Sequence, residues 1–334
     1  MLNYIIRRLV MIIPVLLGVS IIAFSLLHMI PGDPARSMLG NKANEAQLEQ
    51  LREELRLNDP YLVQYGRFVT STLQGDLGKS VKSNNPVGEE LKNRLPATME
   101  LSLFAIFIAT VVGVLAGVIA AVKQYSWFDN LSMTGALFGV SIPIFWLGLM
   151  MIMLFSVTLQ WLPPSGRLST GVELDTITNF YILDSILTLN WTAFKDSITH
   201  LLMPGIALGT IPMAIIARMT RSSMLEVLNQ DYIRTANAKG LASYLVVFQH
   251  ALKNAFLPVL TVIGLQFGFL LGGAVLTETI FSWPGVGRYV LQAILGRDYP
   301  VVQSTILVVA VMFVFINLLT DILYKYIDPR IRFD

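Results

Sequence analysis

The tripeptide Gly78-Lys79-Ser80 is the first place in this 334-residue chain where residue types suggest chemistry. Glycine, lysine and a hydroxyl residue in this order end the loop that binds nucleotide phosphates. That loop also needs a glycine five residues before Gly78, and position 73 is Leu73. The motif therefore fails, and we predict that this chain has no Walker A loop and does not hydrolyse ATP.

Serine and histidine side chains offer a second possible chemistry. An intramembrane serine protease needs a serine–histidine pair inside the bilayer, and Ser20, Ser25 and His28 share one apolar run without a recognisable motif around them. The other histidines, His200 and His250, are too far apart in sequence for a convincing metal site. The chain has no cysteine, which excludes thiolate sites and disulfides. We therefore expect neither a catalytic nor a metal-binding site.

Ionisable residues avoid the centres of the long apolar runs and lie near their ends: His28, Glu100, His200, Glu278 and Asp321. A charge at the bilayer centre costs about 3 kcal/mol or more, so transporters that retain such charges use them. A carrier driven by protons or sodium would show a relay of buried carboxylates, which is absent here. The energy source is thus expected elsewhere. Glu278 is the candidate to line a pathway, and the alternative is a carboxylate in water at the membrane interface.

The composition predicts an integral membrane protein. Hydrophobic residues make up 54% and charged residues 14%, whereas soluble domains carry about one quarter charged residues. The net charge of +2 gives no indication of nucleic-acid binding. Runs long enough to span a bilayer lie near 9–30, 98–122, 131–159, 198–217, 256–280 and 302–323. We predict one all-α membrane domain, 1–334, with six transmembrane helices, a retained signal anchor as the first, and a tilt or kink at Pro143 in the third.

The distribution of charge predicts the orientation. Basic residues dominate before the first run, in the 218–255 loop and in the tail, whereas acidic residues dominate the 160–197 loop. The positive-inside rule then places both termini and the 218–255 loop in the cytoplasm. Aromatic residues at predicted span ends would form an interfacial belt without a recognition role: Trp127, Trp161, Trp191, Trp283 and Tyr299.

The 31–97 segment between the first two spans is expected outside the cell. Within it, 46–57 has leucines at helical spacing with charges between them, which predicts an amphipathic helix. Asn58-Asp59-Pro60 would end that helix.

The 218–255 loop is patterned like folded structure. Its apolar residues Leu225, Leu228, Tyr232 and Ala236 recur at helical spacing. Gly240 follows at a position typical of a left-handed helix cap, and a second helix would run from Ser243 towards Asn254. Two short amphipathic helices hinged at a glycine are suited to docking on another protein.

This loop also carries a family resemblance. Asp231 to Leu241, then His250 to Asn254, resembles the coupling loop of ABC-importer membrane subunits of the dipeptide, oligopeptide and nickel branch. Further matches are Pro31-Gly32-Asp33-Pro34, Gly75 to Ser80, Arg94 to Thr98, Phe281 to Arg288, and Asp328-Pro329-Arg330. The resemblance departs from the family pattern at Asn237 and Ala242, where arginine and serine are frequent.

The resemblance implies a type I ABC-importer permease fold in a bacterial or archaeal plasma membrane. It implies three kinds of partner besides the lipid membrane: a second homologous permease, two cytoplasmic ATPases that bind ATP and Mg, and an external substrate-binding protein. The cargo would be di- or oligopeptides, with nickel, glutathione and oligosaccharides as alternatives. The residues expected to couple to the ATPases are Asp231, Tyr232, Arg234, Thr235, Ala236, Lys239, Gly240, Leu241, His250 and Asn254.

Two other functional classes remain as alternatives at this point. A self-contained secondary transporter or channel would need no ATPase, and neighbouring genes for ATPases and a binding protein would argue against it. A membrane enzyme would need a catalytic constellation, which the sequence does not show.

Overall fold

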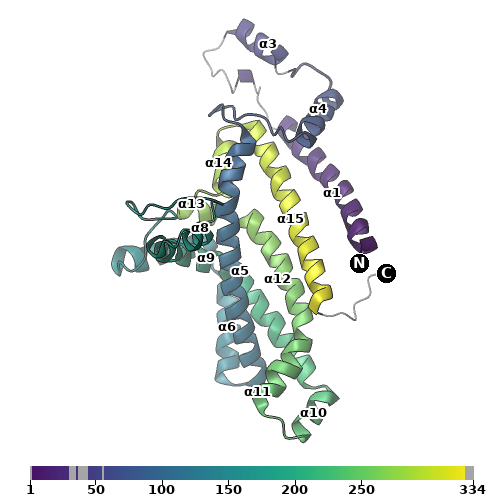
Figure 1. Ribbon diagram of the computed structural model, residues 1–334, viewed down its shortest axis with the longest axis vertical. Helices are drawn as coiled ribbons and strands as arrows, with labels where there is room; N and C mark the ends of the chain where they lie inside the picture. Colours follow the sequence, from purple (N-terminus) through teal and green to yellow (C-terminus); the bar gives the residue numbers. More distant parts are fainter. Residues whose placement is uncertain (1, 30–34, 37–43, 55, 328–334) are drawn as a thin grey trace. The chain divides into compact units, whose positions relative to one another are not determined.

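The computed structural model describes residues 2–29, 35–36, 44–54 and 56–327, which are almost entirely helical (Figure 1). The helices are α1 Leu2–Met29, α3 Glu45–Glu54, α4 Tyr61–Leu73, α5 Val87–Val122, α6 Trp127–Ser141, α7 Ile144–Met151, η1 Ile152–Thr158, α8 Tyr181–Leu187, α9 Trp191–Leu228, α10 Asp231–Ala238, α11 Ser243–Leu245, η2 Val246–Leu252, α12 Lys253–Gly273, α13 Val275–Ile280, α14 Val286–Leu295 and α15 Tyr299–Ile327. Segments η1 and η2 are π-helical. The predicted motifs Pro31-Gly32-Asp33-Pro34 and Asp328-Pro329-Arg330 lie outside the described residues.

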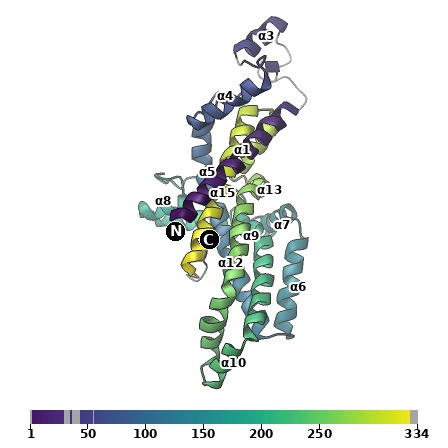
Figure 2. The same cartoon turned by 90° about the vertical axis from the view of Figure 1, so that its right-hand side faces the viewer.

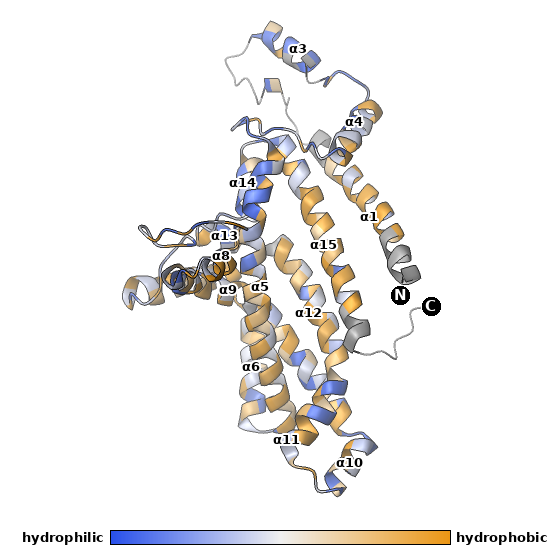
Figure 3. Ribbon diagram, viewed as in Figure 1, coloured by the Kyte–Doolittle hydropathy of each residue, from blue (hydrophilic) through white to orange (hydrophobic). Residues whose placement is uncertain are grey.

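The all-α membrane class is confirmed, and the number of spans is confirmed only in part. Among the described residues, four helices are long and apolar enough to cross a membrane, namely Val87–Val122, Trp191–Leu228, Ser243–Gly272 and Tyr299–Thr320. A bent pair, α6 with α7 and η1, makes a possible fifth. Apolar residues dominate these helices in Figure 3. The first predicted span corresponds to α1, whose described apolar part, Val10–Ser25, is shorter.

The third predicted span bends by 102° between α6 and α7. Ile142 and Pro143 have extended backbone angles there, and α7 begins directly after the proline. A proline removes a helical hydrogen bond and disfavours helical angles at the residue before it. The kink expected at Pro143 is therefore present, and it is large enough to redirect the chain.

The chain forms two compact units, residues 1–95 with 285–314, and residues 96–284 with 315–334. In the first unit, α5, α14 and α15 share an apolar core that includes Val87, Val286 and Val301. The carboxylate of Asp298 accepts a hydrogen bond from Ser80 Oγ at 2.5 Å. The loop that carries the Gly78-Lys79-Ser80 tripeptide is thus attached to the start of α15.

The helix predicted over 46–57 is confirmed as α3, Glu45–Glu54, and its location outside the cell stays a prediction. Its Leu48 is buried. The side chain of Asp59, in the tripeptide expected to end the helix, pairs with Arg67 on α4.

In the second unit, α5 and α9 approach each other closely through small residues. A Cβ atom added at Gly113 would lie 2.8 Å from the carbonyl oxygen of Met213, and one at Gly209 would lie 2.8 Å from that of Ala105. Glycine lets two helix backbones meet at this separation, as is common in membrane helix pairs. The resulting core, between α5, α9 and α12, also includes Trp283.

The aromatic belt is only partly as predicted. Trp127, Trp161 and Trp191 are well exposed. Trp283 and Tyr299 are buried, so the prediction that they belong to an interfacial belt is wrong. Trp283 is instead held in the core, where its indole N–H donates to the carbonyl of Ala97 at 2.8 Å.

Candidate functional site

The segment predicted to couple to ATPases lies at one end of the second unit, where α10 connects α9 to α11 (Figures 1 and 2). Gly240 has a φ of +76°. The N–H of Gly240 donates to Asn237 O at 2.9 Å, and that of Leu241 donates to Ala236 O at 3.4 Å. These two bonds form a Schellman cap, which confirms the left-handed glycine expected at the end of this helix.

The two short helices expected on either side of Gly240 are not both present. The apolar residues predicted to share one helix are divided between two helices, because α9 ends at Leu228 and the chain turns before α10 begins at Asp231. The second predicted helix is not separate, because α11 and η2 continue into α12 without a break. The residues with apolar spacing are helical, as predicted, but spacing alone cannot distinguish one helix from two helices that meet at a turn. Only α10 is therefore a discrete element.

α10 is fixed to the transmembrane helices by its buried face. Ile233 and Ala236 pack in a core with Val118 of α5, Met224 of α9 and Val246 of η2. A displacement of α10 must therefore be felt by three long helices, since protein cores resist deformation.

The remaining residues of the predicted coupling set are mostly at the surface. Tyr232 is 43% exposed, whereas Ala236 is buried and cannot meet a partner without rearrangement. His250 is half-buried, and the other members are exposed: Asp231, Arg234, Thr235, Lys239, Gly240, Leu241 and Asn254. Polar contacts among them are local, such as Arg234 with Asp231 at 3.4 Å.

Two further aromatic residues lie at this surface, outside the predicted coupling set. Tyr244 and Phe248 are 65% and 51% exposed, respectively. Their four-residue separation places them on one helical side, which is the signal that could have found them. Tyr232 and Leu241 are two further exposed apolar residues of the same segment, and exposed aromatic side chains often anchor a protein partner.

Asp129 and Arg221 form a second feature of this end that the sequence analysis missed. Arg221 Nε and Nη2 donate to the two carboxylate oxygens of Asp129 at 2.6 and 2.8 Å. Asp129 is buried in the first turn of α6, and its carboxylate also accepts the N–H of Tyr125. The pair joins α6 to α9 one turn before Met224, which packs against α10. Ser126 three residues before Asp129 is a helix-capping pattern that could have placed the carboxylate.

The opposite end of this unit contains Glu278, the residue predicted to line a pathway. Its side chain is fully buried and accepts a hydrogen bond from Thr98 Oγ1 at 2.6 Å. The backbone N–H of Trp283 donates to Glu278 O. The alternative of a water-exposed interfacial carboxylate is therefore wrong for the conformation described here, and the pathway role stays a prediction.

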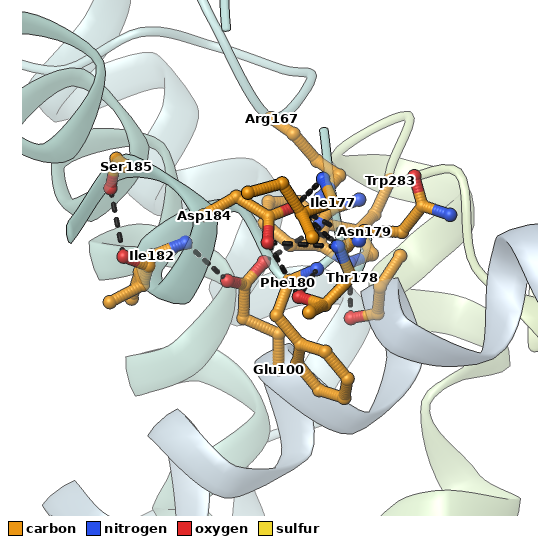
Figure 4. Close-up of polar contacts among 11 residues, drawn as sticks. Glu100, Arg167, Ile177, Thr178, Asn179, Phe180, Ile182, Asp184, Ser185 and Trp283 are labelled. Atoms are coloured by element: carbon orange, nitrogen blue, oxygen red, sulfur yellow. Dashed lines mark hydrogen bonds and ion pairs between the residues drawn. The ribbon is translucent and has the colours of Figure 1, made fainter. Parts of the chain in front are cut away.

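A buried polar network lies near the same end (Figure 4). Arg167 Nη2 donates to Glu100 Oε2 at 2.5 Å and to Asn179 O at 2.9 Å. The guanidinium carbon lies 3.5 Å from the centre of the Tyr181 ring, and Glu100 Oε1 accepts the N–H of Ile182 at 2.7 Å. These contacts bind the loop between η1 and α9 to α5. From sequence, Glu100 and Arg167 were an isolated carboxylate and a loop charge, because contacts over this chain separation leave no local pattern.

No cluster of histidine, cysteine or carboxylate side chains that could hold a metal ion occurs in the described part of the chain. His200 is buried, with Nδ1 2.9 Å from the carbonyl oxygen of Asp196. The side chain of Asp196 accepts from Ser169. Asp196 thus attaches the same loop to α9, and His200 contacts the backbone of Asp196 within α9.

Comparison with known proteins gives matches over nearly the whole chain. The family described as "Binding-protein-dependent transport system inner membrane component" matches residues 113–333, and the family for the N-terminal part of such components matches residues 1–102. The chain is 56% identical to the dipeptide transport system permease protein of Alkalihalophilus pseudofirmus, with 100% of both chains covered. It is 51% identical to the di/tripeptide transport system permease protein of Pseudomonas aeruginosa, with 99% of both covered. It is 42% identical to the glutathione transport system permease protein of Escherichia coli, with 100% of both covered.

The Asp129–Arg221 pair gives a testable prediction. Asp129→Asn leaves a largely buried guanidinium without its carboxylate, which should cost about 1–3 kcal/mol of stability. We expect a lower melting temperature of the purified chain in detergent, and partial recovery when Asp129→Arg is combined with Arg221→Asp. Asp175→Asn, at an exposed loop position, is the control. An unchanged melting temperature for Asp129→Asn would show that the pair does not hold α6 to α9.

Proposed function

We propose, because this chain belongs to the family of binding-protein-dependent transport inner membrane components, that it forms half of the translocation pathway of an ATP-driven importer for di- and oligopeptides. The observation that carries the proposal is the 56% and 51% identity, over full length, to permeases named for dipeptide and di/tripeptide transport. Identity to a permease named for glutathione is lower, at 42%. Family membership also favours this function over a self-contained secondary transporter or channel.

The proposed assembly contains a second, homologous permease, two cytoplasmic ATPases and an external substrate-binding protein in a bacterial or archaeal plasma membrane. ATP and Mg would be bound by the ATPases and not by this chain. The engagement of Ser80 with a carboxylate supports this assignment, since an acidic side chain there would repel a phosphate.

Reconstitution tests the function directly. Liposomes containing the purified assembly should take up labelled dipeptide only with internal ATP and external binding protein, and unlabelled dipeptides should compete better than glutathione. Uptake driven by a proton gradient without ATPases would overturn the proposal, and stronger competition by glutathione would change the cargo.

The proposed topology has six spans, both termini in the cytoplasm and residues 31–97 outside. The charge distribution supports it. The native chain has no cysteine, so single introduced cysteines report their own location.

Cysteines at Asn84 and Thr176, both exposed positions, should react with an impermeant thiol reagent in intact cells, whereas one at Asn237 should react only after lysis. Thr176 is preferable to Thr178, whose hydroxyl donates to Asp184 at 2.6 Å. Labelling at position 237 in intact cells would contradict the orientation.

For coupling, we propose that α10 and the residues up to Asn254 contact the ATPases. Closure of the ATPase dimer would displace α10, and the core beneath α10 would transfer that displacement to α5, α9 and α12. The exposed Tyr232 supports this role, because it stands on the outer side of a helix whose inner side is buried.

Gly240→Val tests the geometry of this segment. A Cβ atom at Gly240 meets nothing within 4 Å, so the expected defect of valine is the positive φ, worth about 1 kcal/mol or more. We expect normal membrane insertion, weaker recovery of the ATPases in pull-downs, and ATP turnover that no longer responds to cargo. Gly240→Asn tolerates positive φ and should behave like the parent.

Tyr232→Ala should give the same uncoupled phenotype by removing the anchor, and Tyr232→Phe should retain coupling. If Gly240→Val and Tyr232→Ala both assemble and transport normally, the segment is not the coupling element.

For the pathway, we propose that Glu278 meets a cationic group of the cargo when the outer end of the unit opens. Glu278→Gln keeps the shape, and its amide can still accept from Thr98. Transport of dipeptides should fall while the amount of protein in the membrane stays constant. Normal transport by Glu278→Gln would restrict Glu278 to a structural role.

A further inference from the structure

Helix α8 buries its polar side chains and exposes its apolar ones, which is the reverse of a helix on the surface of a water-soluble protein. Asp184 and Ser185 are fully buried, whereas Leu183, Ile186 and Leu187 are 44%, 43% and 55% exposed. The three apolar residues are separated by three and four positions, so they share one face of the helix. This face, with Leu189 and Trp191 after it, is called the α8 apolar surface below.

The inward polarity of α8 is fixed by hydrogen bonds. The Asp184 carboxylate accepts the N–H groups of Ile177, Thr178 and Asn179, as Figure 4 shows. Glu100 accepts the N–H of Ile182 in the first turn of α8. Rolling the helix to bury its leucines would leave these buried carboxylates unsatisfied, which is strongly unfavourable. The α8 apolar surface must therefore face outwards.

The composition of this surface indicates what covers it. Between Phe180 and Phe194 the only charged residue is Asp184, and that residue is buried. Protein-binding surfaces have a polar rim around an apolar centre, whereas lipid tolerates an uncharged apolar surface without one.

The position of α8 in the chain points to the same environment. The loop that contains it leaves the bent span at η1 and ends where the long α9 span begins at Trp191. Trp161 and Trp191, near the two ends of the loop, are both strongly exposed. Exposed tryptophans beside spans are typical of the interfacial zone of a bilayer.

We propose that α8 lies in the interfacial zone of the bilayer, with Leu183, Ile186 and Leu187 against the acyl chains. The helix would then hold the Glu100–Arg167 network, and with it this part of α5, at the membrane surface. The proposal rests on the membrane-spanning role of the chain, and it is independent of cargo, coupling and orientation.

Spin labels can test this placement, because the chain has no native cysteine. Single cysteines at Leu183, Ile186 and Leu187 would carry a nitroxide in the full chain, in the assembly with which it purifies. The reconstitution would use phosphatidylethanolamine–phosphatidylglycerol liposomes. Glu173→Cys and Thr176→Cys, exposed polar positions of the same loop, are the matched controls.

The ratio of nitroxide collision rates with oxygen and with a water-soluble nickel chelate should be several-fold higher at the three α8 positions than at the two controls, because oxygen partitions into lipid. Ratios like those of the controls would place the surface in water and overturn the proposal. Low collision rates with both reagents would show that a protein covers the surface, such as the second permease or the binding protein, and would also overturn it. Failure of peptide uptake with a high oxygen ratio would contradict the proposed function without affecting this one.

Discussion

The close packing of α5 against α9 is the constraint on which the second unit depends. Glycines at 113 and 209 remove the side chains that would separate the two backbones. The pair reaches both functional ends of the unit: α5 carries Glu100 near one end and Val118 near the other, about 27 Å apart at 1.5 Å per residue. A backbone contact of this kind cannot slide without steric overlap, so the two helices must move together. In the coupling that we propose, a displacement of α10 could reach the opposite end of the unit through this pair.

The buried polar residues of the unit connect helices and loops to one another. Asp129 joins α6 to α9, Glu100 joins α5 to the loop that contains α8, and Asp184 closes that loop on itself. Each carboxylate has a guanidinium or N–H donor, as burial requires, because an unsatisfied charge in this environment would be costly. These contacts fix the geometry more than they add to the net free energy of folding. The attraction within a buried pair does little more than offset the cost of desolvating both charges. Of the ionisable residues predicted near span ends, Glu100 therefore makes sense as a structural joint, and Glu278 is the one for which we propose a pathway role.

Much of the fold could be predicted from the sequence, because membrane helices and glycine caps leave local signals. The apolar runs, the bend at Pro143, α3 and the positive φ of Gly240 follow from hydrophobic spacing and from the special backbone properties of proline and glycine. The contacts between distant residues could not be predicted, because the partners of Glu100 and Asp129 are set by packing. The same limitation explains the error at Trp283, where position near a span end indicated an interface and the tertiary structure buried the ring. For the candidate site, the sequence identified the segment, whereas the structure shows which of its side chains face outwards.

An importer of the proposed kind must couple two sites through one element with two states. The geometry restricts where that element can be. The core beneath α10 joins it to α5, α9 and α12, so a push on α10 cannot be absorbed locally at its inner face. The π-helical segment η2 lies in this connection, between Gly240 and α12. A π-helix has i→i+5 hydrogen bonds in place of the i→i+4 bonds of its α-helical neighbours, and such segments are frequent at functional sites. For the coupling proposed above, the α5–α9 pair would transmit the displacement. The π-helical segment η2, where the hydrogen-bonding pattern changes, would be the place where α12 changes its rotation relative to the pair.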